Sequence, residues 1–367
     1  MSRAGCLAVC AAWLDRPGAA GRALAGFEAA AGDPDAFIRE LRGQRLTSVA
    51  LEVGARLAAP ERVLAPLGEL VRAEAARSLA LESSAAELAG AAAAGGLEAI
   101  VIKGPALDRR YGERGRRPFG DIDLLADAKD AAAWARCLSA LGYRQMLPVD
   151  RTWRRGGTET VDLHFKSSDL VGAIDVPEEL SPVRLDFAAM RARSGRLEGL
   201  PFPALCVEDE LVVAAGHGLG VHVFERLLWL LDVAVLAGLA ADAARLAGIA
   251  GESGAGRLVF HALDAAARLG LIDAREDLLG PLRPKSVGRT ERRLMDRLVR
   301  EGLPNQAEFL LALVLPAPRG YRRTLLGRAL LPRRRALGTE GTGRGIAGGA
   351  LRHFAKVLRI GALALRP

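Results

Sequence analysis

Hydrophobic residues recur at helical intervals over the first quarter of the chain. Between Asp33 and Gly96 the apolar and polar positions follow the pattern of successive helices, with breaks at Pro60 and at the Gly95–Gly96 pair. One apolar stripe advances in steps of three and four residues: Leu64, Leu67, Val71, Ala75 and Leu79. A stripe with this period is the face of a helix that packs against another element. We therefore predict a scaffold of helices before residue 96.

The pattern changes at residue 97, where short apolar runs replace the helical period. LEAIVIKG (97–104) contains three consecutive β-branched residues and ends in glycine, as a buried strand would. FGDIDLLAD (119–127) is a second strand, and TETVDLHFK (158–166) is a third, with one apolar face and one polar face. YRQML (143–147) and TWRRGG (152–157) are further strand candidates. These runs predict one small mixed sheet, with a helix over residues 128–143 between its strands.

The helical pattern returns after Pro201 and Pro203 and continues from Val207 to about residue 315. Aromatic residues make up only 5% of the chain, while the good helix formers Ala, Leu and Arg are abundant. We predict an α+β fold in which helical regions flank the small sheet on both sides. The expected division is an N-terminal helical region (1–95), a core (96–205), a C-terminal helical region (206–318) and a basic tail (319–367).

The positive charge of the chain is concentrated in this tail. The net charge is +8, and residues 319–367 hold twelve Lys or Arg against one acid, so the remainder carries a net charge of −3. Segments 324–338 and 348–365 mix basic residues with Leu, Ile and Phe at helical spacings. This composition is typical of a helix on an anionic membrane surface or of an arm that binds nucleic acid. A solvated terminus without a partner is the alternative.

Three further features bear on where the protein works. The apolar run 4–14 is similar to part of a signal peptide, but Asp15 and Arg16 close it, so we expect a buried helix instead. The later apolar run 227–241 contains an acid and is shorter than the roughly 20 residues that a bilayer span needs. Four scattered cysteines suit small core residues in a reducing compartment. We expect no membrane-spanning segment and a cytoplasmic location.

Acidic residues in two of the predicted strands carry the candidate chemistry. Asp121 and Asp123 are one residue apart on a strand, so their carboxylates share a face and repel each other unless a divalent cation neutralises them. Mg²⁺, or Mn²⁺ in its place, suits such a site and also binds substrate phosphates. Asp162 on a neighbouring strand would complete a two-metal site or position an acceptor hydroxyl. Gly104 lets the backbone approach a phosphate closely.

Other interpretations of these residues remain open at this stage. Asp121 and Asp123 could cap a loop or face solvent on an edge strand, although a third acid at Asp162 favours the metal site. His164 is either a hydrogen-bonded support or a catalytic participant, and we treat it as a support. Arg117 either binds a triphosphate through two donors or pairs with an acid.

Charged and aromatic residues in the C-terminal helical region need separate consideration. His217 and His222 are five residues apart, roughly 140° around a helix, so both cannot ligate one metal from a regular helix, and we expect no zinc site. Asp232 lies within LLWLLDVAVL (227–236), where an unpaired charge is costly. We expect it to meet Arg226, a histidine or a backbone donor, and to support the structure.

At these residues the chain resembles a known family. The segment 102–126 is similar to the uncharacterised nucleotidyltransferases of the DNA-polymerase-beta superfamily, whose pattern is K-G, a variable loop and R-P-x-x-D-I-D-L-L. The matching residues are Lys103, Gly104, Arg117, Pro118, Asp121, Ile122, Asp123 and Leu124. VDLHFK resembles the later D/E-L-H element and supplies Asp162 and His164. Segment 203–236 resembles the C-terminal helix pair of the family, with His217, Arg226, Trp229 and Asp232 at matching places.

The resemblance covers about residues 33–269 and leaves out the basic tail. The gap from Gly104 to Asp121 exceeds the usual superfamily spacing, and Lys103 stands where many members have an apolar residue; both departures are typical of this particular family. The resemblance implies catalytic Asp121, Asp123 and Asp162 as ligands of the metal. It also implies nucleotide-binding roles for Lys103, Gly104, Arg117 and His164, with His217, Arg226 and Asp232 as support.

The expected function is the transfer of a nucleoside monophosphate, AMP, from a nucleoside triphosphate, ATP, to a hydroxyl of a small molecule or a protein. The sequence does not identify the acceptor. The alternative is a catalytically inactive regulatory module that retains nucleotide binding. Three converging acids argue against the module, because a domain without chemistry has no need of them.

Overall fold

The computed structural model describes residues 3–146, 151–166, 170, 178–302, 317 and 320–324. The predicted basic tail lies outside these residues except for 320–324, and so does the predicted helical stretch 303–315. The tail and its partners therefore stay predictions, as does the four-part division of the chain.

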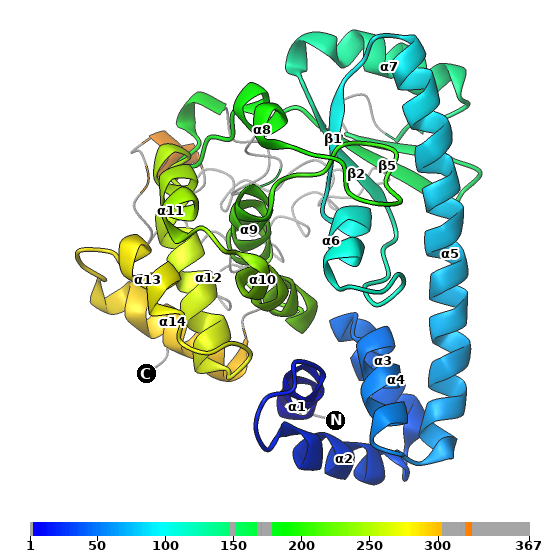
Figure 1. Cartoon of the computed structure of the whole chain (residues 1–367), viewed down its shortest axis with the longest axis vertical. Coiled ribbons are helices and arrows are strands. Elements are labelled where there is room, and N and C mark those ends of the chain that lie inside the picture. The colour runs from blue at the N-terminus through cyan, green and yellow to red at the C-terminus, as the bar shows by residue number, and fades with distance from the viewer. Residues whose placement is uncertain are drawn as a thin grey trace, which may run out of the picture.

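Five helices precede the sheet, as the apolar pattern predicts. They are α1 (Arg3–Trp13), α2 (Ala19–Ala30), α3 (Pro34–Gln44), α4 (Thr47–Arg56) and α5 (Glu61–Ala94). The Asp33 side chain caps α3 by accepting a hydrogen bond from the backbone N–H of Ala36. Helix α5 is the longest of the five and runs from α2 and α4 to the sheet (Figure 1).

The predicted apolar stripe of α5 is wrong at its far end. Leu67 is fully buried, but Leu79 is 58% exposed. Helix α5 buries Val63 and Leu67 in one hydrophobic core and Leu81 and Leu88 in another, so its buried face changes along its length. A single straight stripe cannot serve two cores that lie in different directions.

The sheet has five strands in the order β1-β2-β5-β4-β3. Their bounds are β1 (Ala99–Ile102), β2 (Ile122–Ala126), β3 (Arg144–Gln145), β4 (Thr152–Arg155) and β5 (Glu159–His164). Strands β2 and β5 are parallel and the other neighbours are antiparallel, so the predicted small mixed sheet is confirmed. Helix α6 (Gly104–Arg110) follows β1, and α7 (Ala131–Ala140) follows β2 after the short η1 (Ala128–Asp130).

Helices return after the sheet. They are α8 (Phe187–Arg193), α9 (Val207–Ala215), α10 (Leu227–Leu239), α11 (Ala243–Glu252), α12 (Gly256–Arg268), α13 (Glu276–Leu282) and α14 (Arg289–Glu301), with a short 3₁₀ turn η3 (Glu178–Leu180) before α8. A π-helical turn, η4 (Gly216–Val221), separates α9 from the approach to α10. No helix in the described part of the chain is both long and apolar enough to cross a bilayer.

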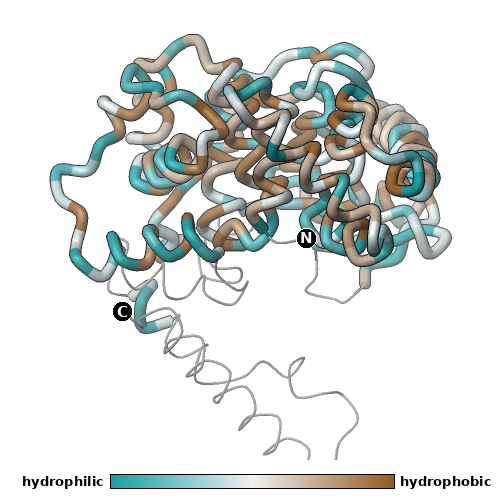
Figure 2. The backbone as a smooth tube through the Cα atoms, turned by 90° about the horizontal axis from the view of Figure 1, so that it is seen from below, coloured by the Kyte–Doolittle hydropathy of each residue, from teal (hydrophilic) through white to brown (hydrophobic). Residues whose placement is uncertain are grey.

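Two hydrophobic cores meet at the sheet. On β1, Ile100 and Ile102 enter a core that also holds residues of the N-terminal and C-terminal helices, whereas Ala99 and Val101 enter a core with α5 and α7. Alternate residues of a strand point to opposite faces, so this strand is covered on both sides. Hydrophobic stretches accordingly run through the middle of the molecule, and hydrophilic residues mark many of its outer turns (Figure 2).

Candidate active site

The three predicted acids lie at one cavity between the sheet and the helices. Asp123 on β2 and Asp162 on β5 are direct partners in the parallel ladder, so their side chains project from the same face of the sheet. Asp121 precedes β2 by one residue. All three line a cavity of about 260 Å³, together with Lys103, Gly104, Arg117, His217, Arg226 and Asp232 of the sequence-predicted residues.

A buried charge network surrounds Asp123. Lys103 Nζ lies 2.7 Å from Asp123 Oδ1, and His164 Nε2 lies 2.9 Å from the same oxygen. Burial alone would raise the pKa of Asp123, but the Lys103 charge and the His164 hydrogen bond outweigh it and hold that pKa well below its usual range. Asp123 is therefore the acid of the site that most favours the ionised form.

Asp121 and Asp162 behave in the opposite way. The charge of Asp123, followed by burial, raises the pKa of Asp121 to about 6. Burial, followed by the charge of Asp123, also raises the pKa of Asp162. Arg151 offsets part of this effect, because its Nε lies 3.9 Å from Asp162 Oδ2. The repulsion that the sequence predicts for closely spaced acids is thus present in the folded chain.

The geometry of Asp123, Asp162 and His164 fits a divalent cation. Each offers one ligand atom, and these atoms all lie within 4.8 Å of one another. Asp162 Oδ1 and His164 Nδ1 are buried and have no hydrogen-bond partner among the described residues. An unsatisfied buried polar atom is costly, and a cation beside Asp162 would satisfy its Oδ1. His164 thus joins the two aspartates as a candidate ligand, whereas Asp121 is not in this group and its role as a ligand stays a prediction.

Burial, followed by the nearby charge of Lys103, lowers the pKa of His164 to about 4. The imidazole is therefore neutral near pH 7, the form in which histidine ligates metals. Burial also lowers the pKa of His217 well below its ordinary value, with further contributions from Lys103 and His222.

Arg117 forms a buried bidentate ion pair. Its Nε and Nη2 donate to the two carboxylate oxygens of Asp232 at 2.7 and 2.9 Å, and the Tyr111 hydroxyl donates to Asp232 Oδ1 at 2.8 Å. The expected partners of Asp232, namely Arg226, a histidine or a backbone donor, are therefore wrong. The true partners lie 115 and 121 residues away, a relationship that local sequence cannot encode. Of the two alternatives for Arg117, the structure shows the second, in which the arginine pairs with an acid.

Asp108 organises the loop that carries Arg117, and the sequence analysis missed it. Its buried carboxylate accepts hydrogen bonds from the backbone N–H of Gly115 and of Arg117, and it also pairs with Arg109. An acid next to two arginines in a short helix offers no distinctive signal in sequence. Asp108 shapes the loop so that Arg117 meets Asp232.

Gly104 has a packing role beside its predicted approach to phosphate. A Cβ atom at this position would lie 3.2 Å from the carbonyl oxygen of Asp121 and 3.3 Å from Cβ of Phe119. The start of α6 therefore packs directly against the segment that leads into β2. The contact with phosphate stays a prediction.

Aromatic rings also line the cavity. The rings of His222 and Trp229 stack with centroids 4.1 Å apart, and the His217 ring meets His222 edge-on at 4.6 Å. The two histidines come together because this segment is not the regular helix on which their predicted separation of roughly 140° was based. Residues 216–221 form a π-helical turn. Gly218 lets the Phe224 ring pack against this turn, because a Cβ there would lie 2.6 Å from that ring.

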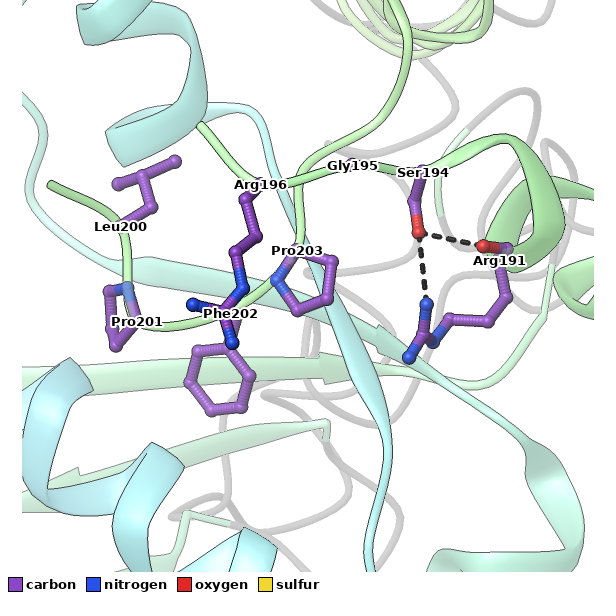
Figure 3. A pocket seen from close by; sticks show the side chains of 8 residues that line it. All are labelled: Arg191, Ser194, Gly195, Arg196, Leu200, Pro201, Phe202 and Pro203. Carbon is purple, nitrogen blue, oxygen red and sulfur yellow. Dashed lines mark hydrogen bonds between the residues drawn. The ribbon is translucent and has the colours of Figure 1, made fainter. Parts of the chain in front are cut away.

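A second cavity, of about 480 Å³, lies along the loop after α8 (Figure 3). Arg191, Ser194, Arg196 and Phe202 are among its lining residues, and Arg191 Nη1 lies 3.4 Å from Ser194 Oγ. Its wall contains none of the carboxylates of the first cavity. The converging acids, and not cavity size, therefore identify the candidate active site.

Comparison with known proteins agrees with this assignment. A family model described as "Uncharacterised nucleotidyltransferase" matches residues 30–270. This range includes every residue that lines the carboxylate cavity, and it confirms the family resemblance of the sequence motifs. Neither the curated proteins nor the solved structures contain a match to the chain.

Proposed function

The chain belongs to the uncharacterised nucleotidyltransferase family, and from this membership we propose that it transfers AMP from ATP to a hydroxyl of a small molecule or a protein. The observation that carries the proposal is the convergence of Asp123, Asp162 and the buried His164, with Asp121 lining the same cavity as the two other aspartates. Family membership supports nucleotidyl transfer in general. The choice of nucleotide, metal and acceptor is our proposal.

Asp123, Asp162 and His164 are the residues that would hold Mg²⁺ or Mn²⁺. When bound, the cation supplies positive charge that draws the triphosphate to the acids and offsets the charge that develops on the α-phosphoryl group. Because Asp123 stays ionised in its pairing with Lys103 and His164, it is ready for this role at neutral pH.

Asp162 is the residue that we assign to the acceptor. Its raised pKa makes it a better proton acceptor than an exposed aspartate, and its Oδ1 is free of partners within the described residues. In the transfer step, the acceptor oxygen forms a bond to the α-phosphorus as its proton moves to Asp162. The bond from the α-phosphorus to the bridging oxygen breaks, and pyrophosphate leaves with the electron pair.

One observation favours the second candidate, a module that binds nucleotide without turnover. Lys103 already neutralises Asp123, so the folded chain tolerates its central acid without a cation. Such a protein would keep its fold and its cavity after the loss of catalysis.

Release of pyrophosphate separates the two candidates. Full-length protein is incubated with ATP and Mg²⁺ or Mn²⁺, with cell extract as the pool of acceptors. Its release of pyrophosphate is compared with that of a double variant, Asp123→Asn with Asp162→Asn. Asp127→Asn is the matched control, because Asp127 follows the same strand but pairs with Lys129 outside the cavity. Cation-dependent release in the wild type and the control, but not in the double variant, supports the enzyme. Binding of ATP without release across all extracts supports the module.

A further inference from the structure

The charges of the carboxylate cavity are not fully paired. Three cations of the cavity already have acidic partners. Lys103 pairs with Asp123, Arg117 with Asp232, and Arg151 with Asp162. Two further guanidinium groups line the same cavity, those of Arg45 and Arg226. Neither has an acidic partner within ion-pair distance among the residues that the structure describes, although Asp121 and Glu225 line the cavity as well.

A hydrogen bond between their neighbours in the sequence holds the two arginines near each other. Gln44 Oε1 accepts from the backbone N–H of Leu227 at 2.9 Å, which ties the end of α3 to the start of α10. Arg45 directly follows Gln44, and Arg226 directly precedes Leu227. Two segments that are more than 180 residues apart thus bring two positive charges to one cavity wall.

The conformation of Arg45 is unusual for a residue with a side chain. It ends α3 with φ 55° and ψ 41°, the left-handed region that glycine and asparagine prefer. Helix α3 therefore ends on a residue whose backbone conformation glycine would adopt without strain. Although the residue as a whole is exposed, loss of hydration around the guanidinium lowers the pKa of Arg45, and the nearby charge of Arg226 lowers it further.

Arg226 is placed by an aromatic contact. Its guanidinium carbon lies 5.4 Å from the ring centroid of Trp229, within the range of a cation–π interaction. This contact orients the side chain and leaves its hydrogen-bond donors available. The two neighbouring guanidinium groups repel each other, and the charge of Asp121 offsets only part of this effect on Arg45. A ligand with several negative charges would relieve the remaining repulsion.

We infer that Arg45 and Arg226 together bind the β- and γ-phosphates of the nucleotide, the pyrophosphate portion that leaves in the transfer. The α-phosphate would then lie toward Asp121, Asp123 and Asp162 in the same cavity. The inference rests on the proposed function for the identity of the ligand. It also gives the N-terminal helices a direct part in the site, because Arg45 belongs to them and lies outside the motifs that resemble the family.

Binding of inorganic pyrophosphate and of AMP to the full-length protein tests this inference. Titration calorimetry in EDTA compares the wild type with Arg45→Met and Arg226→Met. Arg42→Met is the matched control, because Arg42 is an exposed arginine in the last turn of the same helix and does not line the cavity. Thermal unfolding confirms that each variant is folded, and Arg45→Lys serves as a second variant that keeps the charge.

We expect each cavity variant to weaken pyrophosphate binding about tenfold or more, because charge-assisted hydrogen bonds are lost. The control should match the wild type, and AMP affinity should change less than about twofold in all variants. Unchanged pyrophosphate affinity in both cavity variants overturns the inference, and so does an equal loss of AMP affinity. If the wild type turns over ATP but both cavity variants bind pyrophosphate as tightly as the wild type, the inference is refuted and the proposed function stands. If the cavity variants bind pyrophosphate more weakly but the wild type does not turn over ATP, the proposed function is refuted and the phosphate-binding site stands.

Discussion

Lys103 Nζ lies 2.7 Å from Asp123 Oδ1, in a cavity where both side chains are largely withdrawn from solvent. The lysine neutralises the acid that the proposed cation would also contact. Its backbone has φ 53°, in the left-handed region, so the segment between β1 and α6 holds it in a demanding conformation. The pair therefore links the stability of the empty site to its affinity for a cation.

Replacement of Lys103 by Met should lower the melting temperature of the metal-free protein. Removal of one partner leaves Asp123 buried with His164 alone, and breaking a buried pair costs about 3 kcal/mol or more. The shift in Tm that Mg²⁺ or Mn²⁺ produces should then exceed that of the wild type, because the cation no longer competes with the ammonium group. Differential scanning calorimetry with and without EDTA measures both effects. Lys129→Met, on the exposed side of the chain, is the control; equal Tm values for all three proteins would contradict the prediction.

Asp123→Asn and Asp162→Asn should each reduce nucleotidyl transfer on the order of 100-fold or more, because each removes a charge required for metal or acid-base function. Side-chain size is nearly unchanged, so circular dichroism should match the wild type. Asp123→Asn should also abolish most of the stabilisation by cation with ATP, whereas Asp162→Asn should retain more of it. If both variants turned over ATP at the wild-type rate, the assignment of Asp123 and Asp162 to the active site would be wrong.

Asp121→Asn should change how stability depends on pH in the presence of EDTA. The pKa of Asp121 is raised in the folded state from 3.8 to about 6, so the folded state holds this proton more tightly than the unfolded state. The stability that the group contributes is complete below pH 4 and is lost as pH rises through about 6. The variant lacks this loss, so its free energy of unfolding should rise relative to that of the wild type by about 3 kcal/mol between pH 4 and pH 7. Urea unfolding at a series of pH values measures the difference, and a constant difference from pH 4 to 7 would disprove the explanation.

Arg117→Met should act mainly on stability. The guanidinium and Asp232 are both buried, so loss of either partner should cost about 3 kcal/mol. A double variant, Arg117→Met with Asp232→Leu, should recover much of that loss, because no buried charge is then left unpaired. Denaturant unfolding of the two single variants and the double variant gives the coupling energy. An Arg117→Met protein of wild-type stability with a raised KM for ATP would instead indicate that Arg117 binds the triphosphate.

Deletion of residues 336–367 should leave nucleotidyl transfer intact and weaken binding to anionic vesicles or to nucleic acid at low salt. Co-sedimentation with vesicles and gel-shift titration measure the two partners. Full-length protein that binds neither would contradict the partner role of the tail.

Local patterns in the sequence determined the elements and the chemistry that they carry. Three β-branched residues before Gly104 predict β1, and alternation in TETVDLHFK places Asp162 on the polar face of β5, because the side-chain period of a strand is a property of its own backbone. The acids of the site could therefore be named from the sequence. Their family motif could be recognised for the same reason, since it is contiguous along the chain.

The partners of these residues were decided by the tertiary structure. Periodicity shows which face of an element is buried but not which element covers it, so Leu79 was misplaced when α5 served two cores. The pairing of Arg117 with Asp232 and the approach of Arg45 to the cavity depend on how the helical regions dock across more than 100 residues of chain. Such docking depends on how the whole core packs, because no short segment of sequence specifies the element against which it packs. The sequence by itself thus determined the acids of the candidate site, and only the folded chain decided which cations surround them.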